Sequence, residues 1–165
     1  MNHYLCEFTL EQRTYFVIWC SDQTDMLLRT KTGTIAIFPD VSSANQDAQN
    51  QRYKLEIETI ARYNFDEIDN WCSSPNEKTL NHSDMLNAWN MLEDAFRGCK
   101  VEAEFSSRSK TANHIYEKLF YGNNLPAITP EGQHFTPTWT VGELEELSSV
   151  LRYWTACLRR IIKIE

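Results

Sequence analysis

The sequence predicts an α+β domain in which an N-terminal antiparallel sheet of about five strands is covered on one face by about four C-terminal helices. The change in hydrophobic period is the main observation. Apolar residues recur with a period of two across residues 1–63 and with a period near 3.6 across residues 64–165. No low-complexity tract or interdomain linker interrupts the chain, so we expect its 165 residues to form a single domain.

Five strands are predicted in the first part, at residues 4–10, 15–20, 26–30, 34–38 and 53–59. Residues 15–20 are apolar throughout, so we place them in the centre of the sheet. Gly33 supplies the positive φ that the turn before the fourth strand needs. The last strand alternates, with Tyr53, Leu55, Ile57 and Thr59 on the buried face and Lys54, Glu56 and Glu58 on the exposed face. Residues 41–52 are polar on nearly all sides, which leaves a helix and a loop both open.

Four helices are predicted in the second part. The first begins at Asn64, the second near Ser83 with its end at Gly98, the third at residues 107–109 with its end at Gly122, and the fourth at Thr140. The fourth start is the clearest, because Thr140 and Glu143 make a capping box and Trp139 and Leu144 stand where a hydrophobic staple places its two residues.

The fourth helix carries an apolar stripe at helical spacing, made of Leu144, Leu147, Leu151, Trp154, Leu158 and Ile161. The stripe fits an intramolecular core, and a dimer seam is the alternative. Acidic residues at the start of this helix and basic residues at its end, Lys163 included, complement the helix dipole.

The sequence gives no sign of a membrane span, a cofactor or a metal site. No run of about 18 apolar residues occurs, and the N-terminus lacks the basic segment of a signal peptide, so we expect a cytoplasmic protein. The five cysteines form no C-x-x-C pair and the four histidines show no metal-ligand spacing. We therefore expect no catalytic residues, although a Cys–His pair or dispersed acids working with His134 remain open.

Charge is unevenly distributed. The chain carries −7 overall, and residues 56–77 carry six carboxylates against Arg62 alone. This bias is opposite to that of a nucleic-acid binder and favours a basic protein partner, with a merely solubilising surface as the alternative. At the start of the first predicted helix, Asp66, Glu67 and Asp69 also complement the helix dipole. We expect these three carboxylates to be exposed, so that reversing their charge leaves the fold intact.

Residues 121–139 form a long segment without helical or strand period that holds three of the five prolines. In one interpretation Leu125, Ile128, Phe135 and Trp139 anchor it across the core. In the other, the stiffened segment contacts a partner.

The segments LNAWNMLED (86–94), YEKLFYGNNLP (116–126) and residues 139–151 resemble immunity proteins of bacterial contact-dependent growth inhibition systems, and residues 63–71 are similar in style. The resemblance implies a cytoplasmic, non-enzymatic protein that neutralises one cognate C-terminal toxin domain, often a nuclease with a basic substrate surface. The sequence leaves the oligomeric state open, and a monomer is the expectation. Candidate contacts are Glu56, Glu58, Asp66, Glu67, Asp69, Asn123, Asn124, Glu131 and His134. The alternatives are a small enzyme and an adaptor that dimerises through its last helix.

Overall fold

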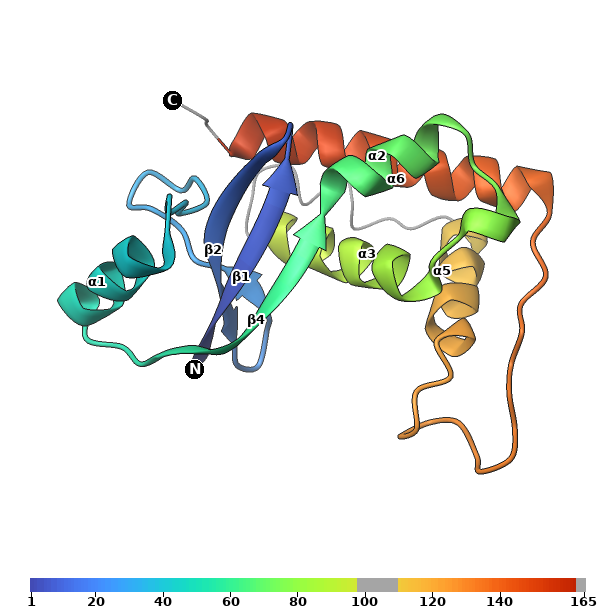
Figure 1. Ribbon diagram of the computed structural model, residues 1–165, viewed down its shortest axis with the longest axis horizontal. Helices are drawn as coiled ribbons and strands as arrows, with labels where there is room; N and C mark the ends of the chain where they lie inside the picture. The colour runs from blue at the N-terminus through green and yellow to red at the C-terminus, as the bar shows by residue number, and fades with distance from the viewer. Residues whose placement is uncertain (98–109, 163–165) are drawn as a thin grey trace.

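The computed structural model describes residues 1–97 and 110–162 and confirms the α+β class (Figure 1). The predicted helix end at Gly98, the helix start at residues 107–109 and the contribution of Lys163 lie outside the described residues. The strands are β1 (Asn2–Leu10), β2 (Arg13–Ser21), β3 (Met26–Leu27) and β4 (Leu55–Asn64). The helices are α1 (Val41–Gln51), α2 (Phe65–Ser73), η1 (Glu77–Thr79, a 3-10 turn), α3 (His82–Phe96), α5 (Lys110–Gly122) and α6 (Val141–Ile161).

The sheet is mixed, which corrects the prediction of an antiparallel one. Its order is β3-β2-β1-β4, and β4 runs parallel to β1 because the connection through α1 returns the chain to the end where β1 starts. The described residues contain four strands: residues 26–30 contribute only the two-residue β3, and residues 34–38 make only the isolated bridges Arg29–Ile35 and Phe16–Phe38. Gly33 does turn the chain here, with a φ of 85°.

The edge strand β4 contains a wide irregularity. Tyr4 of β1 pairs with Glu56, but Cys6 pairs with Ala61. The register therefore shifts here, because a step of two residues along β1 corresponds to a step of five residues along β4. The alternation predicted for residues 53–59 therefore ends at Glu56. Ile57 and Thr59 are exposed instead of buried, and the Ile57 side chain is 40% accessible. Bulges and exposed charges commonly prevent the edge strand of a sheet from pairing with a strand of another molecule.

Helices cover both faces of the sheet, not the single face predicted. One face of β1, with Phe8 and Leu10, packs in the main core with α2, α3 and α6. The other face, with Leu5 and Ile18, packs against α1, which lies apart from the other helices in Figure 1. The buried residues of α1 are Ala44 and Ala48, and most of the rest of the helix is polar. Two small apolar residues give too weak a periodic pattern to decide between a helix and a loop from the sequence.

The local helix signals are present in the structure. The Asn64 side chain accepts a hydrogen bond from the Glu67 N–H, and Thr140 and Glu143 form both bonds of a capping box. Trp139 and Leu144 are both buried in the main core, as a staple requires. The apolar stripe of α6 is also buried there, apart from the partly buried Ile161, so this stripe is core and not a free dimer seam.

Candidate functional site

A recess of about 450 Å³ opens beside the free edge of β4, between the end of that strand, α2 and α3. Its walls are aromatic and apolar, with Tyr63 and Trp71 among them, and its polar rim carries Glu7, Glu67 and Asp84. One arginine, Arg62, also lines it, and its guanidinium lies 3.4 Å from the Glu7 carboxylate while the Arg62 side chain stays 71% exposed.

A second recess, of about 500 Å³, continues along α3 and shares Tyr63 and Asn87 with the first. It is lined by three further carboxylates and one further arginine, which are Asp25, Glu93, Asp94 and Arg97. We call the two recesses together the acidic groove. Its described lining holds six carboxylates and two arginines.

Asp94 is a largely enclosed carboxylate of this lining. Its side chain is 13% exposed, accepts a hydrogen bond from the Trp19 indole at 3.1 Å and lies 3.4 Å from the Arg97 guanidinium. Burial raises the pKa of Asp94 to about 6, although Arg97 and the indole N–H both oppose that rise. The second recess therefore holds a carboxylate that is costly to ionise.

Contacts at both ends of α3 hold the groove in place. At the start, the Asn81 side chain accepts hydrogen bonds from the N–H groups of Ser83 and Asp84. At the end, the Arg29 guanidinium donates to the carbonyl oxygens of Ala95 and Arg97, both at 2.9 Å. These bonds satisfy groups that a helix terminus leaves unpaired.

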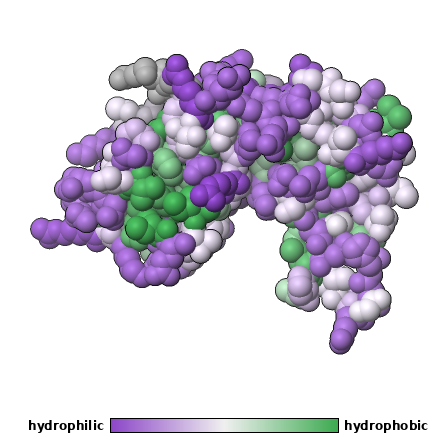
Figure 2. Space-filling model, viewed as in Figure 1, coloured by the Kyte–Doolittle hydropathy of each residue, from purple (hydrophilic) through white to green (hydrophobic). Residues whose placement is uncertain are grey.

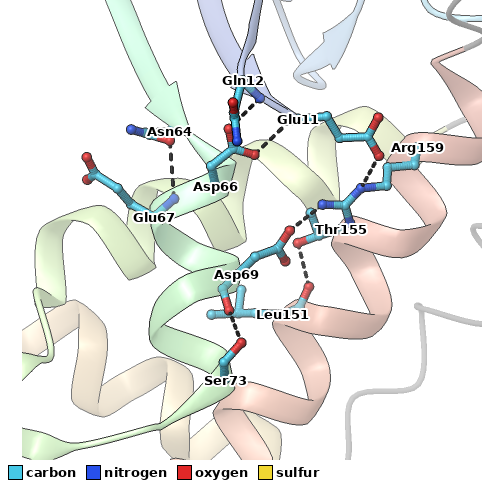
Figure 3. A network of polar contacts seen from close by, with 10 residues as sticks. All are labelled: Glu11, Gln12, Asn64, Asp66, Glu67, Asp69, Ser73, Leu151, Thr155 and Arg159. Atoms are coloured by element: carbon cyan, nitrogen blue, oxygen red, sulfur yellow. Dashed lines mark hydrogen bonds and ion pairs between the residues drawn. The ribbon is translucent and has the colours of Figure 1, made fainter.

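Two of the predicted contact residues take part in the fold itself (Figure 3). The Asp66 carboxylate accepts the N–H of Glu11 and that of Gln12, each at 2.7 Å. Glu11 and Gln12 form the β1–β2 hairpin turn with φ values of 53° and 60°, a conformation that ordinary residues adopt at a cost. Asp69 forms an ion pair with Arg159 of α6. Reversing Asp66 and Asp69 would therefore disturb the fold, contrary to the expectation from the sequence.

The remaining predicted carboxylates lie at different places. Glu67 is exposed and lines the acidic groove. Glu56 of β4 forms an ion pair with Lys54, which immediately precedes that strand, and Glu58 is exposed in the irregular part of β4. Of the acidic residues predicted from the sequence, Glu67 is thus the one that belongs to the groove.

The predicted residues of the segment after α5 divide into two kinds. Asn123 donates to the carbonyl oxygens of His82 and Leu119, and Asn124, at a φ of 49°, binds both the N–H and the carbonyl of Phe135. Glu131 and His134 are exposed at the far end, and neither side chain makes a hydrogen bond or an ion pair to another of the described residues. The asparagines are structural, and only the other two are open to a partner.

Residues 123–140, which we call the projecting loop, extend away from the body of the molecule (Figure 1). Leu125, Ile128 and Phe135 are between 42% and 46% exposed, so the interpretation that they anchor the segment in the core is wrong. Only Pro137 and Trp139, near the root, are buried. Figure 2 shows apolar surface along the inner flank of this projection.

Sequence reasoning missed the groove carboxylates of α3, although a signal for them exists. Asp84, Asn87, Asn90 and Asp94 recur at steps of three and four, which places a polar stripe beside the buried face of this helix. A polar stripe is normally read as a solvated surface. Only the position of β4 opposite this stripe makes it one wall of a groove.

Within residues 1–97 and 110–162, no three side chains of His, Cys, Asp or Glu come together in a way that could hold a metal ion. None of the described helices combines the length and apolar composition of a membrane span. Comparison with protein-family models, with curated proteins and with solved structures returned no match.

Proposed function

We propose that this protein is an immunity protein that neutralises a basic toxin domain, such as a nuclease, by binding it through the acidic groove and masking its substrate surface. The observation that supports the proposal most directly is the lining of the groove, where six carboxylates face two arginines along α3 and the edge of β4. The resemblance of residues 86–94 and 116–126 to immunity proteins supplies the kind of partner.

The groove has the physical properties that such a role requires. Carboxylates set in a recess with apolar walls focus the electric field and raise the association rate of a positively charged partner. The half-buried Tyr63 ring of the lining can also pack against the aliphatic stems or the cationic heads of lysine and arginine side chains. The protein needs no chemistry of its own to inhibit in this way.

The proposal predicts a toxin gene directly upstream of the gene for this chain, and the test is co-expression of the chain with that toxin domain. We expect growth in the presence of the chain, growth arrest in its absence and a complex that co-purifies. Measured by surface plasmon resonance, the association rate should fall steeply as salt is raised.

A charge-reversed variant locates the interface. Glu67→Lys with Asp84→Lys should slow association by about an order of magnitude at low salt. Glu117→Lys with Glu145→Lys changes the net charge equally but alters exposed carboxylates outside the groove, so it should slow association much less. Equal slowing by the two variants would assign the effect to overall charge and remove the groove from the interface.

A further inference from the structure

The projecting loop presents a concentration of apolar surface that the fold does not use. Of the eight large hydrophobic side chains exposed in the described residues, Leu125, Ile128 and Phe135 lie in the loop and Tyr121 lies at its root. The Tyr121 and Phe135 rings meet edge to face, with 6.3 Å between their centroids. Contiguous exposed apolar side chains commonly mark a binding surface.

The loop is held in one conformation at its root. Asn124 makes hydrogen bonds to both backbone polar groups of Phe135, at 2.6 and 2.9 Å, and so closes the loop across its base. The Lys118 ammonium donates to the Thr138 carbonyl at 2.8 Å, and the Trp139 indole donates to His82 Nε2 at 3.1 Å.

Close packing and internal turns stiffen the loop further. A Cβ at Gly122 would lie 2.9 Å from the His82 ring and 3.0 Å from Pro137, so the chain passes here at the closest separation that glycine permits. Beyond the root, the N–H groups of Ile128 and Thr129 both donate to the Leu125 carbonyl, which folds the far part into a turn. A loop ordered before binding loses little conformational entropy when it binds.

The loop differs from the groove in its charge. Its only charged side chain at neutral pH is Glu131, so its electrostatic attraction to a strongly basic surface is weak. It projects from the body, exposes three large apolar side chains and is closed at its base by hydrogen bonds, which fits a concave and weakly charged site. Its root nevertheless lies on the same side as the groove, because the recess lined by Gly122 and Asn123 shares Thr79 and Asn81 with the lining of the acidic groove. One partner could contact both.

We infer that the projecting loop is a preformed wedge whose apolar side chains Leu125, Ile128 and Phe135 enter a concave, apolar site of the same toxin domain that the acidic groove attracts. This inference rests on the proposed function and adds to it that the acidic groove and the projecting loop have separate roles in binding. The groove governs how fast the partner arrives, and the wedge governs how long it stays.

The experiment uses the full chain and the toxin domain encoded upstream, with association and dissociation followed by surface plasmon resonance at several salt concentrations. The wedge variant, Leu125→Ser with Ile128→Ser and Phe135→Ser, should dissociate at least about tenfold faster at every salt concentration and associate within about twofold of wild type. Ile128→Asp, a single change, should act in the same direction.

Two controls separate the wedge from other effects. Val141→Ser removes an apolar side chain that is 72% exposed outside the loop, and should leave both rates unchanged. Glu131→Gln with His134→Gln alters the polar side chains of the loop, and should leave dissociation within about twofold. The melting temperature and circular dichroism of each variant confirm that it is folded.

Each result has a definite meaning. A wild-type chain that does not bind the toxin domain overturns the proposed function and this inference together. Tight wild-type binding with an unchanged dissociation rate in both wedge variants overturns the inference alone. Sedimentation of wild type as a dimer and of the wedge variant as a monomer would assign the apolar loop to a second copy of this chain, and would also overturn it.

Discussion

The indole of Trp139 donates a hydrogen bond to Nε2 of His82, and through this bond the end of the projecting loop is tied to the start of α3. The His82 ring can accept at Nε2 only while that nitrogen is unprotonated. Burial lowers the pKa of His82, with the nearby Glu77 acting in the opposite direction, so the folded protein favours the neutral ring.

Acidification should therefore loosen this attachment. Because the pKa of His82 is lower in the folded chain than in the unfolded one, its contribution to stability is complete above its ordinary value of 6.5 and declines as the pH falls below it. The free energy of unfolding of wild type should fall relative to that of His82→Gln between pH 7 and pH 5. Urea titrations at several pH values provide the measurement. Parallel curves for the two proteins would show that folding does not change the pKa of His82.

Truncating Trp139 should be among the more damaging single changes in this part of the chain. Its side chain is 8% exposed within the main core, and Trp139→Ala should cost about 3–5 kcal/mol. Thr140→Ala, which removes the capping side chain of α6, should cost about 1 kcal/mol. Val141→Ala, at the exposed next position, should stay within about 0.5 kcal/mol. If urea denaturation ranks Trp139→Ala with Val141→Ala, the root of the loop is not packed as described.

Asp66 and Glu67 are adjacent acidic residues whose removal should destabilise the fold to very different extents. Asp66→Ala leaves two backbone N–H groups of the β1–β2 turn without their acceptor and should cost about 1–3 kcal/mol. Glu67→Ala removes an exposed side chain and should cost only the small dipole contribution, about 0.5 kcal/mol. Thermal and urea unfolding would both reveal the contrast. Equal losses would mean that the Asp66 contacts add nothing beyond the charge at the start of α2.

Asp94 should make stability depend on pH in the opposite sense to His82. Its pKa rises from 3.8 to about 6 on folding, so the folded chain binds its proton more tightly and is destabilised as the pH rises through this interval. Relative to Asp94→Asn, wild type should lose about 2 kcal/mol of stability between pH 4 and pH 7. Asn keeps an acceptor for the Trp19 indole, so the comparison isolates the charge. A difference that is constant over this pH range would contradict the raised pKa.

The features predictable from the sequence are those that local chemistry encodes. The capping box at Thr140, the cap at Asn64 and the turn at Gly33 depend on neighbours within a few residues, and all three are present. The direction of β4 was not predictable in this way, because an alternating pattern reads the same in a parallel and an antiparallel strand.

The site depends on contacts between distant parts of the chain, which explains why so much of it escaped prediction. The acidic bias was visible, but whether a carboxylate such as Asp66 or Glu67 faces a partner or a backbone turn 55 residues away is decided by packing. The apolar residues of the projecting loop were misread for a related reason. An isolated Leu or Phe between prolines has no period, and without a period the sequence does not indicate whether the residue is buried.

The contacts of Arg159 also have a consequence for the order in which the chain can assemble. Its guanidinium binds Asp69 and Glu11, and the second of these lies 148 residues earlier, so nearly the whole polypeptide separates the two partners (Figure 3). During synthesis, the hairpin and α2 emerge from the ribosome long before the cation that joins them. Pairing at such separation delays folding, and until residue 159 is made Glu11 and Asp69 remain in water without this cationic partner.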